Sequence, residues 1–241
     1  ADPKLFKRGA GVGQWVDALT RVRGPAVEAL AITFAEDWAL ETGRSLDSPC
    51  PREDLCSAGH TAVQVLPSGP GEHVEAIEQV VLTAVYGATR ELVLTTPYFV
   101  PSESLLTALV SAAARGVEVT LIVPAKIDSK LVHFASRAHQ ADLLAAGVRV
   151  ALYQGGLLHT KSITVDGRLS LFGSLNLDPR SFRLDFEIML AVYDTEYTAS
   201  LRRLQQCYLE QSLLLDQTIL QARSVLERFA EDVARLVGPV L

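Results

Sequence analysis

Apolar and polar positions repeat along the chain with two periods, one typical of strands and the other of helices. Apolar residues two apart predict strands, and apolar residues three or four apart predict helices. The predicted strands cover residues 14–22, 60–66, 91–100, 117–125, 148–153, 159–166, 168–174 and 184–193. The predicted helices cover residues 24–40, 73–88, 102–115, 129–146, 195–213 and 218–237. Because strands and helices alternate, the pattern predicts an α/β fold with a mixed sheet covered by helices on both faces.

A polar segment and a tight turn interrupt these patterns. Residues 43–58 show neither period, so they predict a loop after the first strand and helix. Asp166 and Gly167 join two predicted strands, and Asp-Gly is a favoured two-residue hairpin turn. The predicted C-terminal helix has an apolar side that suits docking on the domain or lying on a membrane, and we favour docking.

Residues 15–38 resemble residues 185–208, with strand aligned on strand and helix on helix. In this alignment Asp17 lies opposite Glu187, and Trp38 lies opposite Tyr208. Such self-similarity suggests one unit used twice, and the simplest inference is that the chain begins in the middle of a duplicated protein. Chance is the alternative, since any strand followed by a helix aligns to some degree.

Composition limits the classes of protein to be considered. The chain has 241 residues, of which 49% are hydrophobic, enough to bury a core. Its formal net charge of -6 gives no general attraction to a polyanion, so we expect no nucleic-acid partner. No stretch approaches the roughly 20 consecutive apolar residues needed to span a bilayer, and the basic N-terminus does not lead into a signal-peptide core.

The cysteines leave two interpretations open. Cys50 and Cys56 share a polar loop, where they form a disulfide in an oxidising compartment or stay free thiols. A zinc site is less favoured, because only His60 is nearby and a fourth ligand is missing. Cys207 lies on an apolar helical face and is expected to pack in the core.

Residues 157–176, LLHTKSITVDGRLSLFGSLN, carry the candidate chemistry. Residues two apart on a strand point to the same side, so His159 and Lys161 project together, and a cation beside an imidazole suits a bound phosphate. On the returning strand, Ser174 and Asn176 are also two apart and can hydrogen-bond phosphate oxygens. The imidazole can attack a phosphodiester or protonate a leaving alcohol, while Lys161 and Asn176 stabilise the charge on the five-coordinate phosphorus.

A carboxylate on the following strand completes this candidate site. Glu187 could hold an imidazole in the required tautomer and orientation. A structural role would instead leave Lys161 unpaired among apolar residues, which is costly, so we interpret His159 as catalytic. A structural role is the simpler interpretation for each of the remaining histidines, which are His60, His73, His133 and His139.

At these residues the sequence resembles the phospholipase D superfamily, whose signature is H-x-K-x4-D-x6-G-[S/G]-x-N. His159, Lys161, Asp166, Gly173 and Asn176 stand at its fixed positions. The resemblance extends to bacterial cardiolipin synthases from about residue 14 to the C-terminus. It is carried by the flanking segments RVRGPAVEAL, TTPYFVPSESLLTAL, GVEVTLIVPAKIDSKLVHFASRAHQADLLAAGVRV and LDPRSFRLDFEIML.

The resemblance implies two signatures in one polypeptide that meet at a single site. Residues 1–45 would then end a first phospholipase D-like half, 46–58 would be a linker, and 59–241 would form the second domain with its C-terminal helices. Asp17 would be the first-half carboxylate, and its hairpin would lie in a missing N-terminal half or in a second subunit.

The resemblance also implies roles for the two histidines of such a pair. One forms a covalent phosphatidyl intermediate and the other protonates the departing alcohol. The nucleophile is usually assigned to the first signature, which makes His159 the acid and later the base. No metal or cofactor is expected, and Asp166 is expected to shape its turn. Asp185 replaces an Asn that is typical of relatives and adds a negative charge near the site.

The implied reaction joins two phosphatidylglycerol molecules, releases glycerol, and takes place at the bacterial cytoplasmic membrane, with attachment through segments outside this chain. Water as the acceptor would make the protein a phospholipid hydrolase. A homodimeric nuclease and a fragment that binds phosphate or lipid without turnover are further alternatives.

Five side chains are candidate lipid contacts. Tyr98 would line the lipid-facing mouth of the site. Lys130 and His133, together with Lys126 and Arg137, could share a helix face toward anionic headgroups or form ordinary solvated surface charge.

Overall fold

A computed structural model describes residues 12–46, 59–70 and 75–216, and the single positions 218, 220, 224, 227, 231, 233 and 234. Cys50, Cys56 and His73 lie outside the described residues, as does most of the predicted helix 218–237.

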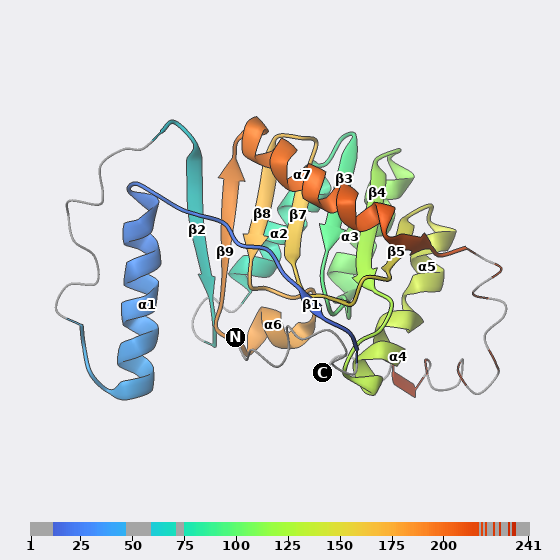
Figure 1. The fold of residues 1–241 in the computed structure, drawn as a ribbon, viewed down its shortest axis with the longest axis horizontal. Helices are drawn as coiled ribbons and strands as arrows, with labels where there is room; N and C mark the ends of the chain where they lie inside the picture. The colour runs from blue at the N-terminus through green and yellow to red at the C-terminus, as the bar shows by residue number, and fades with distance from the viewer. Residues whose placement is uncertain are drawn as a thin grey trace.

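One mixed sheet of eight strands forms the centre of the fold, in the order β10-β5-β4-β3-β7-β8-β9-β2 (Figure 1). The strands are β2 (Ala62–Ser68), β3 (Glu91–Thr95), β4 (Glu118–Pro124), β5 (Arg149–Tyr153), β7 (Lys161–Val165), β8 (Leu169–Gly173), β9 (Glu187–Tyr193) and β10 (Ser212–Leu214). Strands β3, β4 and β5 are parallel, and every other neighbouring pair is antiparallel. The ends of β3 and β8 and the starts of β7 and β9 therefore meet at one end of the sheet, called the site end below.

Helices cover both faces of the sheet, which confirms the predicted α/β fold. Helices α2 (Ala76–Gly87), α3 (Glu103–Ala114) and α5 (Gln140–Ala145) lie on one face, and α7 (Thr195–Glu210) crosses the other (Figure 1). Alternate residues of β3 point to opposite faces of the sheet and contribute to the core on each face. Leu92 and Leu94 pack in the cluster under α2 and α3, and Val93 packs with Tyr208 of α7.

A buried polar network fixes α7 on the sheet. The Gln205 side chain is fully buried, and its amide nitrogen donates to the Val93 carbonyl oxygen at 3.3 Å and to Ser162 Oγ at 3.1 Å. Its amide oxygen accepts a hydrogen bond of 2.8 Å from Thr164 Oγ1. Because all these polar atoms are paired, the network specifies one register of α7 on β3 and β7.

The structure corrects several predicted element boundaries. The predicted strand 14–22 is reduced to β1 (Trp15–Val16), which pairs in parallel with β6 (Leu157–Leu158) outside the main sheet. The predicted helix 129–146 is divided at His139 into α4 (Lys130–Ala138) and α5, because α4 packs against Val100 through Ala135 while α5 joins the main core. The predicted helix 195–213 ends at Glu210, and β10 follows it.

Two smaller predictions also change. Cys207 is exposed on α7, so the expectation that it packs in the core is wrong; the buried face of the helix carries Leu201, Gln205 and Tyr208 instead. A short helix, α6 (Pro179–Arg183), follows β8 and was not predicted. Its start has a readable signal, since Asp178 caps it by accepting the Ser181 N–H at 2.7 Å and Pro179 occupies the first turn.

Candidate active site

Three positions of the predicted site lie together at the site end of three neighbouring strands. Lys161 begins β7, Gly173 ends β8, and Glu187 begins β9. The strand register places Lys161 opposite Gly173, and Gly173 opposite Met189. The hairpin and the returning strand thus bring the two parts of the motif side by side, as their spacing predicts.

Gly173 allows β9 to approach β8 closely. A Cβ atom at this position would overlap the Ile188 carbonyl oxygen and lie 2.7 Å from Met189 Sδ. Ser174 stabilises the same contact between β8 and β9 through two hydrogen bonds. Its N–H donates to the Ile188 carbonyl oxygen and its Oγ accepts the Ile188 N–H, both at 2.9 Å. The Ser174 hydroxyl therefore holds β9 in place, where the sequence suggested a phosphate ligand.

Lys161 is a buried cation that lies against the His159 ring. Its Nζ atom is 2.8 Å from His159 Nδ1 and 3.1 Å from Nε2, and it donates to the His159 carbonyl oxygen at 2.7 Å. Only 7% of the residue is exposed. Burial lowers the pKa of Lys161 from 10.5 to about 8, even though the charges of Asp17, Glu187 and Asp178 act to raise it.

Asp17 is the carboxylate that contacts the His159 imidazole. Its Oδ2 atom lies 3.1 Å from His159 Nδ1, and the Trp15 ring stacks on the His159 ring with 4.2 Å between centroids. Burial acts to raise the pKa of Asp17, but the bonds from His159 and the Ala18 N–H, together with the charge of Lys161, lower it overall. The sequence suggested Glu187 as the partner of an imidazole, whereas this structure places Asp17 beside His159.

A close crossing of two backbone segments brings Asp17 to His159. Leu157 N–H donates to the Gln14 carbonyl oxygen at 3.0 Å, and His159 N–H donates to the Val16 carbonyl oxygen at 2.7 Å. Gly156 has a φ of 132°, and a Cβ atom there would overlap the Gln14 carbonyl oxygen. A glycine at this position is what lets β1 lie against β6.

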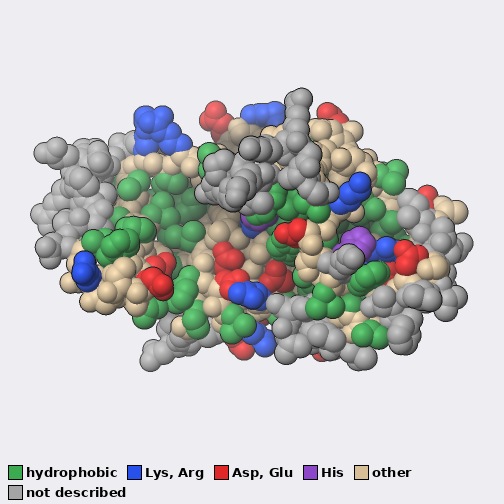
Figure 2. Space-filling model, turned by 60° about the horizontal axis from the view of Figure 1, so that its bottom comes forward, with side chains coloured by type: hydrophobic (Ala, Val, Ile, Leu, Met, Phe, Trp, Pro, Cys, Tyr) green, Lys and Arg blue, Asp and Glu red, His purple; other side chains and the backbone are tan. Residues whose placement is uncertain are grey.

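Glu187 and Asp178 place two more carboxyl groups near Lys161. Burial raises the pKa of both carboxyls. Hydrogen bonds from the Ser174 and Ser181 hydroxyls act to lower the pKa of Glu187, and hydrogen bonds from Ser181 act to lower that of Asp178, but burial outweighs them. Acidic side chains accordingly gather near the middle of the molecule when it is seen from the site end (Figure 2). The roles of Asp178 and Ser181 were not predicted from the sequence, although Asp-Pro is a recognisable helix start.

Asn176 faces α6. Its Nδ2 atom donates to Ser181 Oγ at 3.0 Å, and its Oδ1 atom is buried without a hydrogen-bond partner among the described residues. A buried acceptor left unpaired in this way is costly, so it marks a position where a ligand that donates a hydrogen bond would be favoured.

Asp166 lies at the far end of the hairpin. It is five residues along β7 from Lys161, which corresponds to about 16 Å. Its carboxylate accepts the Thr89 hydroxyl at 2.7 Å and the backbone N–H groups of Thr89, Arg90 and Glu91 at 2.8 to 2.9 Å. These bonds outweigh burial and hold its pKa at about 2. Asp166 and Gly167 have φ of 53° and 69°, so the carboxylate braces the turn and is remote from the imidazole.

The predicted lipid contacts are more dispersed. Tyr98 follows β3 at the site end, where its hydroxyl donates to Asp128 Oδ1 at 2.9 Å and burial raises its pKa. His133 lines a separate cavity of about 200 Å³ beside α4. Arg137 Nε lies 2.9 Å from Glu231 Oε1, so part of the predicted basic face is neutralised. The side chain of Lys130 lies outside the described part of the chain.

Three further observations bear on charge and location. Asp185 pairs with Arg180, whose Nε atom lies 3.1 Å from Asp185 Oδ1, which offsets the added negative charge. Within the described ranges, no group of three or more His, Cys, Asp and Glu residues is placed to hold a metal ion. In the same part of the chain, every helix is too short or too polar to cross a membrane.

Comparisons with known proteins point to one family. The family model described as "Cardiolipin synthase, PLD-like domain" matches residues 81–207. The whole chain is 47% identical to Cardiolipin synthase A of Erwinia tasmaniensis and covers 50% of that protein. The chain therefore spans about half the length of the curated relatives it matches.

Solved structures share the fold at low sequence identity. One is Nuc, a phospholipase D family member from Salmonella typhimurium, with a TM-score of 0.58 and 20% identity. The match covers 66% of this chain and 100% of the Nuc chain. Another is phosphatidylserine synthase from Haemophilus influenzae, with a TM-score of 0.59 and 22% identity. The match covers 75% of this chain and 48% of the synthase chain. With its complete H-x-K-x4-D-x6-G-S-x-N signature and the match of more than half its residues to the family model, the chain belongs to the cardiolipin synthase family of phospholipase D-like domains.

Proposed function

We propose that this chain is the second half of a bacterial phosphatidyltransferase that makes cardiolipin from two molecules of phosphatidylglycerol. The observation that carries the proposal is the contact of His159 with both Asp17 and Lys161 at the site end of the sheet, in a chain of this family. Relatives named Cardiolipin synthase A that are 47% and 48% identical over the whole chain support the choice of reaction.

His159 acts as the proton carrier in this scheme. Asp17 Oδ2 lies 3.1 Å from His159 Nδ1, so it favours the tautomer with the proton on Nδ1, in which Nε2 carries the lone pair and can exchange a proton with the substrate alcohol. The phosphate binds beside Lys161 and Asn176, where the ammonium group stabilises the charge on phosphorus. Transfer proceeds through a phosphohistidine on the other half, so that nucleophile and acid lie on opposite sides of the phosphorus.

Residues 1–45 supply the end of that first half. Helix α1 (Ala26–Thr42) carries apolar residues on all sides, yet none of its described residues is buried. Phe34 is 58% exposed and Trp38 42% exposed, although a helix that is apolar all round normally lies inside a protein. In the internal alignment α1 corresponds to α7, which covers the sheet of this half, so α1 is expected to cover the sheet of the other half.

The same alignment assigns a role to Glu187. Asp17 corresponds to Glu187 and contacts an imidazole of the opposite half. By the same symmetry, Glu187 is expected to contact the imidazole of the first half, which leaves residues 46–58 as the linker between the halves. The enzyme works at the cytoplasmic membrane, where its anionic lipid substrate lies.

Two alternatives use the same site. Water in place of the second lipid would give phosphatidic acid. A homodimeric nuclease is disfavoured by the net charge of -6, which opposes binding of a polyanion.

The test uses the full-length protein with vesicles that contain phosphatidylglycerol, and mass spectrometry of the products. Cardiolipin and glycerol are expected in equal amounts, with His159→Ala lowering the rate at least a thousandfold. His60→Ala is the matched control and should keep the rate, because His60 is exposed and lines a different cavity. Phosphatidic acid as the sole product would establish a hydrolase, and full activity of His159→Ala would remove the proposed role of this residue.

A further inference from the structure

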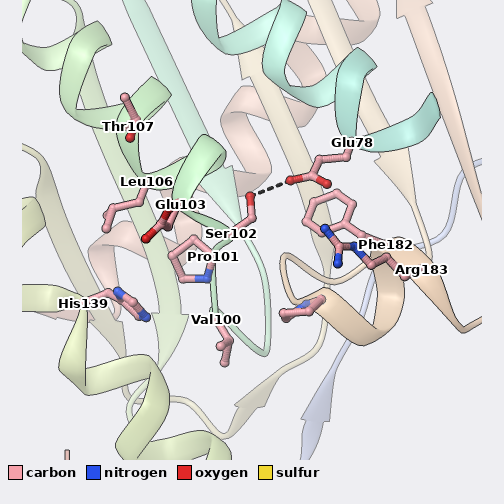
Figure 3. Close-up of a pocket in the computed structure, with 11 residues that line it drawn as sticks. Glu78, Val100, Pro101, Ser102, Glu103, Leu106, Thr107, His139, Phe182 and Arg183 are labelled. Atoms are coloured by element: carbon pink, nitrogen blue, oxygen red, sulfur yellow. Dashed lines mark hydrogen bonds between the residues drawn. The ribbon is translucent and has the colours of Figure 1, made fainter. Parts of the chain in front are cut away.

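Trp15 contacts the His159 ring, yet the proposed mechanism gives it no role. The cavity of about 520 Å³ beside α3 and α6 is a different part of the molecule (Figure 3). None of His159, Lys161, Asp17 and Asn176 lines it, so it is separate from the reacting groups. What orients the His159 imidazole is therefore the set of side chains in direct contact with it, and Trp15 is one of these.

The backbone around β1 brings Trp15 and Asp17 to the same imidazole. Trp15 begins β1 and Asp17 directly follows this strand, and residues two apart along a strand point to the same side. The backbone at Trp15 is fixed, because the carbonyl oxygens of both its sequence neighbours accept hydrogen bonds from the N–H groups of Leu157 and His159. The indole thus depends on the same pairing of β1 with β6 as the carboxylate of Asp17.

The imidazole of His159 lies between Trp15 and Lys161. The ring centroids of Trp15 and His159 are 4.2 Å apart, with an angle of 29° between the ring planes. Lys161 Nζ is 2.8 Å from Nδ1 and 3.1 Å from Nε2, and an atom so close to both nitrogens would overlap Cε1 if it lay in the ring plane. The ammonium group therefore sits over one face, and the indole occupies the other. With Asp17 at Nδ1, the ring is held on both faces and at one edge.

The second copy of the internal repeat carries a different side chain at the position of Trp15. The alignment pairs Trp15 with Asp185, which has no ring to stack. Asp185 Oδ1 lies 3.1 Å from Arg180 Nε. The first-half imidazole, which Glu187 is expected to contact, would therefore meet an ion pair where His159 meets an indole.

We propose that Trp15 is a positioning residue that holds the His159 ring in place for proton transfer and so distinguishes this histidine from the nucleophile. The inference rests on the proposed function. A nucleophilic imidazole must approach phosphorus as their bond forms, whereas a proton carrier must keep its distance from the alcohol oxygen in both steps. A ring held on both faces suits the second task.

A substrate whose leaving group needs no proton provides the test. In the first step the bond from phosphorus to the glycerol oxygen breaks as the bond to the first-half histidine nitrogen forms, and the departing oxygen takes a proton from His159. The leaving group of phosphatidyl-p-nitrophenol departs as the stable p-nitrophenolate anion and takes no proton. Its release in the first turnover therefore reports attack on phosphorus alone, whereas cardiolipin formation also requires proton transfer.

Three variants of the full-length protein are compared. Trp15→Leu removes the indole, Trp15→Phe keeps a ring that can stack, and Tyr86→Leu is the control at an exposed aromatic residue of α2. Trp15→Leu should lower the kcat for cardiolipin formation about thirtyfold, a part of what general acid–base catalysis contributes, and leave first-turnover release of p-nitrophenolate within about threefold of wild type. Trp15→Phe should recover most of the lost kcat, and Tyr86→Leu should change neither rate.

The two substrates and the products separate this proposal from the proposed function. Equal losses with both substrates would overturn the role of Trp15, because they would mean that it supports the site as a whole. An unchanged kcat in Trp15→Leu would overturn it as well. Phosphatidic acid as the sole product, with the loss still confined to the glycerol substrate, would refute cardiolipin synthesis and uphold the role of Trp15.

NMR of the His159 ring tests the contact without turnover. The ring current of an indole shifts the signals of protons that lie over its face upfield. The His159 Hε1 signal, assigned by its loss in His159→Gln, should therefore move downfield in Trp15→Leu and much less in Trp15→Phe. A signal that stays in place in Trp15→Leu would refute the stacked arrangement, whatever the products are.

Discussion

Replacing Lys161 by Met should abolish phosphatidyl transfer and at the same time stabilise the folded chain. Lys161 is 7% exposed, and burial lowers its pKa from 10.5 to about 8. Each tenfold change in the acid constant is about 1.4 kcal/mol, so keeping the proton on this buried amine at pH 7 costs about 3 kcal/mol of folding free energy. Attraction to Asp17, Glu187 and Asp178 is already included in that figure.

Met is unbranched and fills a similar volume, so it removes the charge without opening a large cavity. It also loses the bond of 2.7 Å from Nζ to the His159 carbonyl oxygen, worth about 1 kcal/mol. The net expectation is a gain of about 2 kcal/mol in the free energy of unfolding. In urea this moves the midpoint upward by about 1 M for a slope of about 2 kcal/mol per molar.

Urea unfolding followed by circular dichroism measures this difference, with Lys126→Met as the control at an exposed lysine. The destabilising contribution of Lys161 is complete below about pH 8, where the folded and unfolded chains both hold the proton, and it vanishes above 10.5. The advantage of the Met variant should therefore shrink as the pH rises through this window. A variant less stable than wild type at pH 7, or an advantage independent of pH, would refute the reasoning.

Three further substitutions follow from the same contacts. Asp17→Asn removes a charge that raises the pKa of Lys161, so the alkaline limb of the pH–rate profile, near pH 8 in wild type, should move to lower pH; an unmoved limb would contradict this. Gly156→Ala should displace β1 and reduce transfer at least tenfold with little change in urea midpoint, whereas global unfolding would contradict a local role. Gln205→Leu should lower stability by about 3 kcal/mol, since it unpairs Ser162 and Thr164 in the core; a loss below 1 kcal/mol would show that the network is not cooperative.

The motif positions could be predicted from the sequence because local rules govern them. The two-residue period fixes the common side of His159 and Lys161, and the Asp-Gly turn returns the chain to bring Gly173 opposite Lys161. Helix α6 was missed, but Asp178-Pro179 is a helix start that local rules could have found. In each case the signal lies within a few residues of the element it specifies.

The pairing of Asp17 with His159 could not be predicted in this way. These residues are 142 positions apart, and their contact depends on how closely two segments cross at Gly156. The internal alignment matched Asp17 with Glu187, but an alignment of two units does not say which imidazole each carboxylate faces. That assignment is a property of the tertiary fold, in which a short parallel pair, β1 and β6, overrides the longer strand that the local pattern favours.

The carboxyls around Lys161 counteract the effect of burial on its pKa. Burial alone would drive its pKa lower still, and the charges of Asp17, Glu187 and Asp178 oppose this. The carboxyls thus keep a buried amine protonated near neutral pH, which a phosphate ligand requires. The same carboxyls repel the substrate phosphate, whose charge increases in the five-coordinate state. One lysine among three carboxyls is therefore too little positive charge for the reaction, and a second H-x-K signature facing this one would supply the cation that balances them.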